Sequence, residues 1–350
     1  MRIIVINSQV PFIKGGAEYL EENLVSELQL RGHQVESVKI PFKWYPIPSL
    51  KKSVSILYNL DLTELIGGEA DLVICLKYPT YCIDHPRKVV WLCHQHREAY
   101  DLWSTMTKYI PDIKSRKNLK HFVKLTDNAS LKSCRKVFTI SKNVSLRLKK
   151  YNNIESEATY PPIRFKSFDD TIYYENFFFV PSRITRLKRQ DLVLKAFKNI
   201  NLNFNLIIAG PIDDKIYFEE LNEYIIKNNL KKRVKILGNI TDEKLVYFYK
   251  NCNSVIFIPI DEDYGLITLE AFVHSKAVIS TTDSGGPTEF IENGKNGYLS
   301  EPKPQALYEC LLKLTSRDNA INLGKYSREY FMKKNISWDT TIEKLLSVVK

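Results

Sequence analysis

The sequence predicts an α/β protein with two doubly wound domains, each built on a mostly parallel sheet. The chain has 350 residues, which is long enough for two ordinary domains. Strand-like apolar runs alternate with helix-like segments along most of it, as in parallel sheets that helices cover on both faces. The alternation stops near Tyr160 and resumes at Phe177, after a polar, proline-containing stretch that is typical of a domain linker.

The first domain is expected to span residues 1–165. Its predicted strands are 3–7, 72–76, 89–93 and 137–140, all short apolar runs. A helix is expected over 17–31, because Gly32 provides a stop signal directly after it.

The second domain is expected to span residues 166–335. Its predicted strands are 177–180, 206–209, 234–237, 254–260 and 277–280, separated by amphipathic helical segments. The last segment, 338–350, is predicted to be a helix, and residues 336–350 are expected to pack back toward the N-terminal domain.

Composition indicates a folded, soluble protein. Hydrophobic residues make up 44% of the chain and charged residues 26%. The opening apolar run, 2–7, is too short for a signal peptide, and no run approaches the roughly 20 residues that span a bilayer. Six scattered cysteines with no C-x-x-C pair indicate reduced thiols, mostly in the core. We therefore expect a cytoplasmic protein.

The net charge of +11 indicates an anionic partner without saying which one. Residues 108–150 hold thirteen basic residues and two acidic ones, which predicts a basic surface on the N-terminal half. The alternative is an ordinary solvated helix face. Nucleic-acid binding is not expected, because the chain shows no helix-turn-helix, zinc or RNA-binding aromatic signature.

The loop at 182–189 follows the predicted strand 177–180 and contains four cations, of which Arg183 and Lys188 are the best placed. Ligands of doubly wound sheets bind outside the carboxyl ends of the strands. Cations at a helix start oppose the helix dipole, so we expect an anion to compensate them. A diphosphate would fit, with Arg183 as a bidentate fork and Lys188 as a point charge. The alternative is a solvated basic loop.

The loop at 261–271 follows the apolar strand 254–260. Gly265 lets a ligand approach the backbone at a helix start, and the amides of Leu266 and Ile267 form a phosphate cradle there. Glu262 and Glu270 bracket the same helix start. Carboxylates accept hydrogen bonds from hydroxyls and repel phosphates, so the loop favours a ligand with both groups, such as a nucleotide sugar.

These motifs together resemble glycosyltransferase family 4, enzymes of the GT-B fold. Glu262 and Glu270 match the family's Glu-x7-Glu signature. Ser182-Arg183 through Lys188 match its Gly-Arg-x4-Lys loop, with serine in place of the usual glycine. Segments 15–18, 285–289 and 296–297 resemble further family motifs, so the resemblance covers nearly the whole chain.

The resemblance implies two Rossmann-like domains facing across a cleft, with roles for particular residues. Arg183 and Lys188 would hold the donor diphosphate, Glu262 would bind hydroxyls of the donor sugar, and Glu270 would bind the ribose. The rest of the implied donor site comprises Gly15, Gly16, Gly238, Asn239, Ile240, Tyr264, Gly265, Leu266 and Ile267.

The end of the predicted strand 89–93 carries the N-terminal candidates. His94 matches the family position at which a histidine faces the donor sugar, and with Arg183, Lys188 and Glu262 it completes the implied catalytic set. His96, Arg97 and Ser141 are candidates on the acceptor side. A lone histidine after a strand is otherwise a satisfied core or surface residue.

The implied reaction is a retaining, metal-independent transfer with no cofactor beyond the nucleotide-sugar donor. Asp261-Glu262-Asp263 spells an Asp-x-Asp that binds metal in another glycosyltransferase architecture, but the cations at 182–189 make a metal redundant. The acceptor would be a glycan or a lipid-linked sugar of bacterial surface polysaccharide assembly. Contact of the basic region 108–150 with the cytoplasmic face of the inner membrane stays open, and a sugar phosphorylase or nucleotide-sugar epimerase of the same fold is the alternative enzyme.

Overall fold

The computed structural model describes residues 1–12, 15–43, 45–65, 68–164, 171–200 and 203–349. The chain forms two compact units: Met1–Arg164 together with Ile336–Lys350, and Phe165–Asn335. The C-terminal segment thus belongs to the N-terminal unit. The predicted boundary after residue 165 falls within 165–170, outside the described residues.

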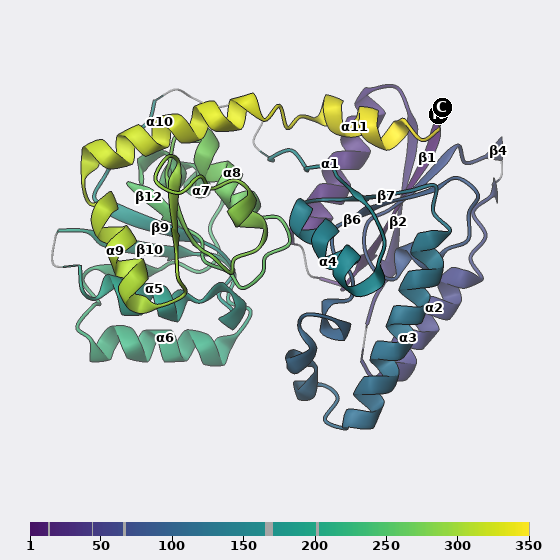
Figure 1. Cartoon of the computed structure of the whole chain (residues 1–350), viewed down its shortest axis with the longest axis horizontal. Coiled ribbons are helices and arrows are strands. Elements are labelled where there is room, and N and C mark those ends of the chain that lie inside the picture. Colours follow the sequence, from purple (N-terminus) through teal and green to yellow (C-terminus); the bar gives the residue numbers. More distant parts are fainter. Residues whose placement is uncertain (13–14, 44, 66–67, 165–170, 201–202, 350) are drawn as a thin grey trace. The chain divides into compact units, whose positions relative to one another are not determined.

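The N-terminal unit is built on a parallel sheet in the order β2-β1-β5-β6-β7-β8 (Figure 1). Its strands are β1 (Arg2–Gln9), β2 (Gln34–Pro41), β5 (Leu72–Cys75), β6 (Lys88–Leu92), β7 (Lys136–Thr139) and β8 (Glu157–Ala158). A two-stranded antiparallel hairpin, β3 (Glu64–Leu65) and β4 (Gly68–Glu69), lies outside this sheet. Strand order reverses between β1 and β5, where a doubly wound sheet has its switch point.

The helices of this unit are α1 (Gly16–Leu30), α2 (Ile47–Tyr58), α3 (Ile113–Lys132), α4 (Lys142–Asn152) and α11 (Trp338–Leu346). Gly32, at φ 82°, ends α1 as predicted, because glycine adopts this left-handed conformation without strain. Helices α2 and α3 lie side by side, joined by a hydrogen bond between Tyr58 and Ser130 of 3.0 Å (Figure 1).

The C-terminal unit is built on a second parallel sheet in the order β11-β10-β9-β12-β13-β14. Its strands are β9 (Phe177–Pro181), β10 (Asn205–Ala209), β11 (Val234–Ile236), β12 (Ser254–Ile256), β13 (Val278–Thr281) and β14 (Gly297–Ser300). Its helices are α5 (Gln190–Phe197), α6 (Lys215–Lys227), α7 (Asp242–Asn251), α8 (Leu266–Val273), α9 (Pro304–Leu314) and α10 (Arg317–Lys333).

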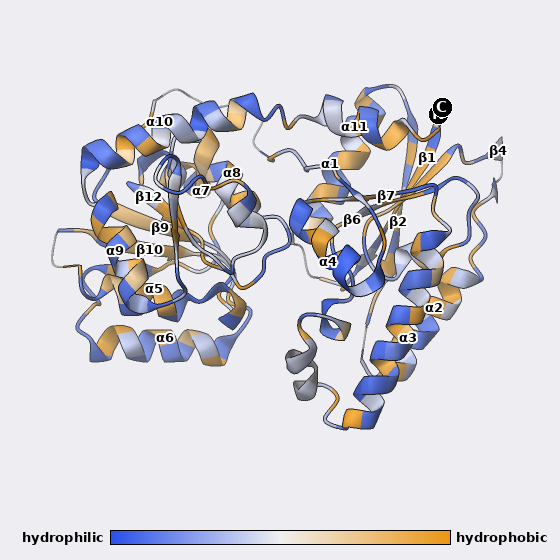
Figure 2. Ribbon diagram, viewed as in Figure 1, coloured by the Kyte–Doolittle hydropathy of each residue, from blue (hydrophilic) through white to orange (hydrophobic). Residues whose placement is uncertain are grey.

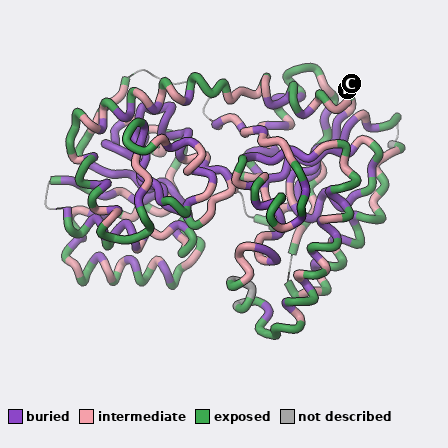
Figure 3. The backbone as a smooth tube through the Cα atoms, viewed as in Figure 1, coloured by how far each residue is buried: buried purple, intermediate pink, exposed green. Residues whose placement is uncertain are grey.

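Helices cover both faces of the second sheet, and the apolar strands fill its core (Figures 1, 2 and 3). Phe178 of β9 is fully buried and stacks on Phe204, with ring centroids 5.1 Å apart. It also meets Phe197 of α5 edge to face. Burial of large apolar side chains, at about 2 kcal/mol each, stabilises the unit and holds its strand ends in place.

The predicted strand 254–260 was too long: β12 ends at Ile256. Beyond it, the amide of Ile260 donates to the carbonyl of Leu187, and Pro259 has no amide to offer a neighbouring strand. The chain therefore leaves the sheet ladder early. The predicted last helix was also too long, since α11 ends at Leu346.

The basic stretch 108–150 forms most of α3, β7 and α4. Among those of its cations whose side chains the structure describes, Arg116 and Arg147 are buried, so the prediction of a basic surface is wrong for those two. Arg147 lies 3.7 Å from the carboxylate of Asp101. Exposed lysines of α3, Lys114, Lys117 and Lys124, do form a basic face. Five of the six cysteines are buried, as expected.

In the part of the chain that the structure describes, no helix combines the length and apolar character that crossing a membrane requires.

Candidate functional site

The loops after β9 and β12 diverge at the switch point of the C-terminal sheet. The chain leaves β9 toward β10 on one side and returns to β12 on the other side of β9. Both strands are parallel, so their carboxyl ends lie at the same edge of the sheet and the two loops open a crevice there. Lys188 and Glu262 come from these two loops.

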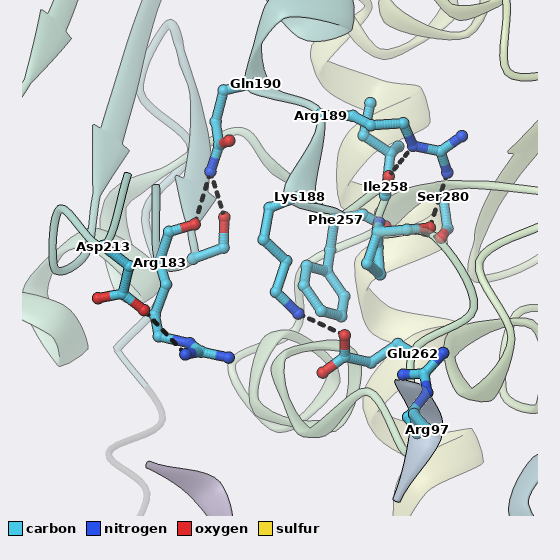
Figure 4. Close-up of polar contacts among 12 residues, drawn as sticks. Arg97, Arg183, Lys188, Arg189, Gln190, Asp213, Phe257, Ile258, Glu262 and Ser280 are labelled. Carbon is cyan, nitrogen blue, oxygen red and sulfur yellow. Dashed lines mark hydrogen bonds and ion pairs between the residues drawn. The ribbon is translucent and has the colours of Figure 1, made fainter. Parts of the chain in front are cut away.

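Lys188 and Glu262 point toward each other across the switch point (Figure 4). The lysine Nζ donates a hydrogen bond to Oε2 of Glu262, and it lies 5.2 Å from the ring centroid of Phe257. The side chain of Lys188 is 10% exposed and that of Glu262 is 30% exposed. The structure thus brings together a cation and a carboxylate that the sequence assigned to different parts of one ligand.

Arg183 extends into solvent at the start of the same loop and forms an ion pair of 2.8 Å with Asp213. Arg186, in the 3-10 helix η4 (Arg186–Lys188), pairs with Glu220 at 2.6 Å and lies over the ring of Tyr217. Each of the four cations of this loop has an acidic partner in the chain, because α6 and the loops after β10, β12 and β13 supply carboxylates. Binding of a ligand anion by these cations stays a prediction.

Helix α8 begins at the crevice. Its N-cap Gly265 has φ 86°, a conformation that glycine adopts without strain. A Cβ at Gly265 would lie 2.7 Å from Pro287, so the position also lacks room for a side chain. Leu266 and Ile267 form the first turn, where helix amides have no intrahelical acceptor. Anions bind favourably at such a helix start, so the geometry is compatible with the predicted phosphate cradle.

The loops after β12 and β13 are held together by backbone hydrogen bonds. The amide of Glu262 donates to the carbonyl of Ser284, and the amide of Gly286 donates to the carbonyl of Glu262, both at 2.8 Å. A Cβ at Gly286 would lie 2.4 Å from the carbonyl oxygen of Tyr264. The pair of glycines at 285–286 therefore allows two backbones to approach closely. The ring of Tyr264 is buried and packs edge to face on Phe290.

Glu270 lies one turn inside α8 and is 3% exposed. Its Oε2 accepts a hydrogen bond of 2.9 Å from the hydroxyl of Tyr249. His274 hydrogen-bonds to the carbonyl of Glu270 and stacks on Tyr249. Burial and nearby cations lower the pKa of His274 despite that hydrogen bond. Glu270 is thus buried below the start of α8, where its carboxylate contacts Tyr249 and its carbonyl contacts His274.

The segment 238–240 follows β11, at the same carboxyl edge. Gly238 has φ 65°, and its carbonyl accepts from the amide of Gly210 at 2.8 Å. Asn239 is exposed, while Ile240 is half-buried. The backbone of this turn is thus tied to the loop after β10.

In the N-terminal unit, Gly15 and Gly16 lie at the switch point between β1 and β5. Gly15 caps α1, and its amide donates to Oε2 of Glu18 at 2.8 Å. Lys77, after β5, forms an ion pair of 2.7 Å with the same carboxylate. Burial raises the pKa of Glu18, but the hydrogen bond and charge of Lys77 outweigh it and lower that pKa overall.

The loop after β6 carries His94, His96 and Arg97. His94 is half-buried, and its Nδ1 lies 2.7 Å from the carbonyl oxygen of Gln95. His96 is 5% exposed and stacks on Tyr78, and burial lowers its pKa. Arg97 donates to the carboxylate of Asp101, with its Nε at 2.8 Å. His94 is thus only partly buried, and its ring contacts a backbone carbonyl, whereas His96 is buried and Arg97 binds a carboxylate.

A buried polar network beneath this loop was not predicted from the sequence. Asp127 of α3 is fully buried and accepts hydrogen bonds from Tyr81 (2.8 Å), Tyr100 (2.7 Å) and Gln95 (3.3 Å). Gln95 also donates to Asn152 at 2.6 Å. Burial raises the pKa of Asp127 to about 7, although the three hydrogen bonds act in the opposite direction. The sequence signal that could have revealed this network is Asp127 itself, an acidic residue in an otherwise basic helix.

Ser141 caps α4 and is fully buried. Its hydroxyl accepts a hydrogen bond of 3.0 Å from the amide of Val144. The side chain thus serves a helix start, which prefers a serine hydroxyl at this position, and the assignment of Ser141 to the acceptor side stays a prediction. No cluster of three or more histidine, cysteine, aspartate or glutamate side chains suited to a metal ion occurs among the residues with described positions.

A family model described as "Glycosyl transferases group 1" matches residues 165–330. An uncharacterized glycosyltransferase of Methanocaldococcus jannaschii is 29% identical over 157 residues, covering 44% of this chain and 42% of the relative. The human alpha-1,3/1,6-mannosyltransferase ALG2 is 26% identical, covering 47% of this chain and 45% of the relative. The chain thus spans less than half the length of these curated relatives.

Solved structures match over nearly the whole chain. A sucrose-phosphate synthase from Thermosynechococcus elongatus superposes with a TM-score of 0.77 at 16% identity, covering 99% of this chain and 98% of that one. WaaG, a glycosyltransferase involved in lipopolysaccharide biosynthesis, gives 0.72 at 15% identity, with both chains fully covered. Anabaena HepE in complex with UDP-glucose gives 0.68 at 17% identity, covering 99% and 100%. The chain therefore has the GT-B glycosyltransferase fold, and its C-terminal unit belongs to the glycosyl transferases group 1.

Proposed function

We propose that this chain is a glycosyltransferase that moves a sugar from a nucleotide-activated donor to a glycan or lipid-linked acceptor. The observation that carries the proposal is the meeting of Lys188 and Glu262 at the switch point, beside the start of α8. A cation and helix amides suit a diphosphate, and a carboxylate suits hydroxyls. A nucleotide sugar presents these groups a few ångströms apart.

In this reaction, negative charge grows on the departing diphosphate. Lys188 and Arg183 would stabilise that charge, together with the amides of Leu266 and Ile267. Groups of this kind, oriented before the reaction, are each worth about 10²–10³ in rate. Glu262 would hold the donor sugar by its hydroxyls, and the ion pair with Lys188 would open as the diphosphate takes the lysine.

We assign the chain to family 4 and its reaction to retaining, metal-independent transfer. The match to the Glu-x7-Glu signature supports this assignment. The sequence contains no carboxylate on the family pattern suited to a covalent intermediate, so the proposed course is displacement on the same face, assisted by the leaving phosphate. A trapped sugar–enzyme adduct would contradict it.

A UDP-sugar is the first donor to test, since the structurally similar HepE binds UDP-glucose. The similarity to WaaG supports a role in bacterial surface polysaccharide assembly. On the N-terminal unit, His94 is the proposed catalytic residue, and His96 and Arg97 of the same loop are proposed on the acceptor side.

The exposed lysines of α3 suggest contact with an anionic membrane that carries a lipid-linked acceptor. Ile113 and Leu125 of the same helix are 55% and 56% exposed, so apolar side chains accompany the charges. Each lysine near such a surface is worth about 1 kcal/mol. Sedimentation with vesicles containing anionic lipid, lost at high salt and absent for neutral vesicles, is the expected result. Equal sedimentation with neutral vesicles would contradict the idea.

The donor site is tested by thermal denaturation in the presence of UDP-, GDP-, dTDP- and ADP-sugars. One donor at a hundredfold excess over its Kd should stabilise the protein by about 2.7 kcal/mol. Arg183→Ala and Glu262→Ala should lose that stabilisation. Arg186→Ala is the matched control, because it removes a cation of the same loop that pairs with Glu220 instead. Absence of stabilisation by every donor would contradict the proposed function.

A further inference from the structure

Arg189 directly follows Lys188 but points away from it (Figure 4). Its backbone has φ 53°, in the left-handed region, and it caps the start of α5. This conformation turns consecutive side chains in different directions. Lys188 reaches Glu262, while Arg189 extends along the ends of β12 and β13, and its side chain is 12% exposed.

The guanidinium of Arg189 donates to groups of two other loops. Its Nε bonds to the carbonyl of Ile258 at 2.8 Å, and Nη2 bonds to the carbonyl of Pro259 at 2.7 Å. Nη2 also reaches Oγ1 of Thr281 at 2.7 Å. Nη1 and Nη2 bind the two carboxylate oxygens of Asp283, each at 2.9 Å. One side chain thus joins the loops after β9, β12 and β13.

These partners lie next to the residues of the proposed site. Ile258 and Pro259 precede Glu262 by a few residues, and they lie where the chain has already left the β12 ladder. The backbone carbonyl of Asp283 accepts a hydrogen bond of 2.9 Å from the amide of Asp261. Without Arg189, the segment 257–264 would lose its bonds from this guanidinium at Ile258 and Pro259, while its backbone bonds to the β13 loop and to Leu187 would stay.

We propose that Arg189 is a positioning residue that fixes Glu262 and the start of α8 relative to Lys188. The expected effect of Arg189 on catalysis rests on the proposed function, whereas its expected effect on the position of the loops does not. Arginine suits the task because its planar fork bonds two carbonyls and a carboxylate at once, which a lysine ammonium cannot do in the same geometry.

Hydrogen exchange of the substrate-free protein tests the positioning role without reference to activity. Arg189→Ala should speed exchange of amides in 260–266 and 282–287, whereas exchange in the N-terminal unit should stay unchanged. Arg186→Ala is the matched control. If Arg189→Ala does not fold, Arg189→Lys and Asp283→Asn should show the same local effect at smaller size. Unchanged exchange at 260–266 in folded variants would overturn the proposal.

Transfer kinetics then connect the loops to the reaction. Arg189→Ala should lower kcat/KM for the donor by roughly 100-fold, since small misplacements of catalytic groups cost this much. Arg189→Lys should recover part of it, and Arg186→Ala should stay within about threefold of the parent. If binding of UDP alone weakens while exchange at 260–266 is unaltered, Arg189 is a direct ligand and the proposal fails. If exchange responds but no donor is ever used, the positioning role holds and the proposed function fails.

Discussion

The ammonium group of Lys188 makes two electrostatic interactions, one with the carboxylate of Glu262 and one with the ring face of Phe257. Attraction between a cation and a ring face adds about 0.5–2 kcal/mol, more when the pair is desolvated. A bound diphosphate would replace only the carboxylate, so the ring could keep the lysine in place. Single residues of this site are therefore held in position before any ligand arrives.

Asp127 is a residue for which a pH effect on stability is expected. Its pKa in the folded protein, about 7, is raised by burial above the ordinary value of 3.8. Between pH 4 and pH 7 the unfolded chain loses this proton while the folded chain keeps it, so stability should fall as pH rises through that window. The difference corresponds to roughly 4 kcal/mol at most.

Asp127→Asn stays neutral and should remove this slope. Urea denaturation of both proteins between pH 4.5 and 8 measures the free energy of unfolding. That of the parent should fall relative to that of the variant up to about pH 7, and above this pH the two curves should run parallel. The comparison also cancels titration of His96, which both proteins share. Curves that run parallel from pH 4.5 onward would contradict a raised pKa for Asp127.

At the scale of elements, short loops after parallel strands carry the proposed chemistry because helix starts follow them. Gly265 ends the loop after β12 and starts α8, and the amide of Gly286 donates to the carbonyl of Glu262. The same arrangement recurs at α1 and α4, whose starts are capped by Gly15 and Ser141. A helix start can serve a ligand only where its amides are not already satisfied by a cap.

Ser141→Ala tests whether that serine serves the helix or an acceptor. Loss of an N-cap costs about 1 kcal/mol of stability, and acceptor KM should not change. Ser316→Ala, which removes the exposed cap of α10, is a matched control for the loss of a cap. Chemical denaturation and acceptor titration measure the two quantities. A large rise in acceptor KM at unchanged stability would support the acceptor role.

At the scale of the whole molecule, the chain returns to its first unit after completing the second. Ile342 and Leu345 of α11 are 3% and 0% exposed, and the ring of Trp338 meets Trp91 edge to face at 6.2 Å. The hydroxyl of Thr341 donates to the carbonyl of Tyr160 at 3.2 Å. The N-terminal unit therefore consists of two separate stretches of sequence.

Removal of residues 336–350 should destabilise the N-terminal unit. Loss of burial at Ile342 and Leu345 alone costs about 3–6 kcal/mol, which lowers Tm by about 10 °C or more. All four tryptophans lie in this unit, and the truncated chain keeps three of them because it loses Trp338, so tryptophan fluorescence follows this unit selectively in both proteins. Asp339→Ala, which breaks an exposed ion pair with Arg31, should have little effect. A truncated chain with unchanged fluorescence melting would contradict the packing of α11.

Much of this architecture was predictable, because buried parallel strands are apolar runs and helix stops are local. The runs at 72–76, 89–93 and 177–180 became strands with ends shifted by one residue or less. The edge strands β2 and β14 were not identified. β2 carries exposed charges such as Glu36 and Lys39, since an edge strand is only partly covered and shows no apolar run.

The sequence by itself determined the α/β class, the grouping of Arg183, Lys188, Glu262 and Gly265 at strand ends, and the glycines that such turns require. These features depend on spacing and on local backbone preference. Only the tertiary structure decided that Lys188 meets Glu262, that Arg189 joins three loops, and that Asp127 lies in a buried network. Those outcomes depend on which strand ends lie side by side, and strand order is set by packing among residues far apart in the chain.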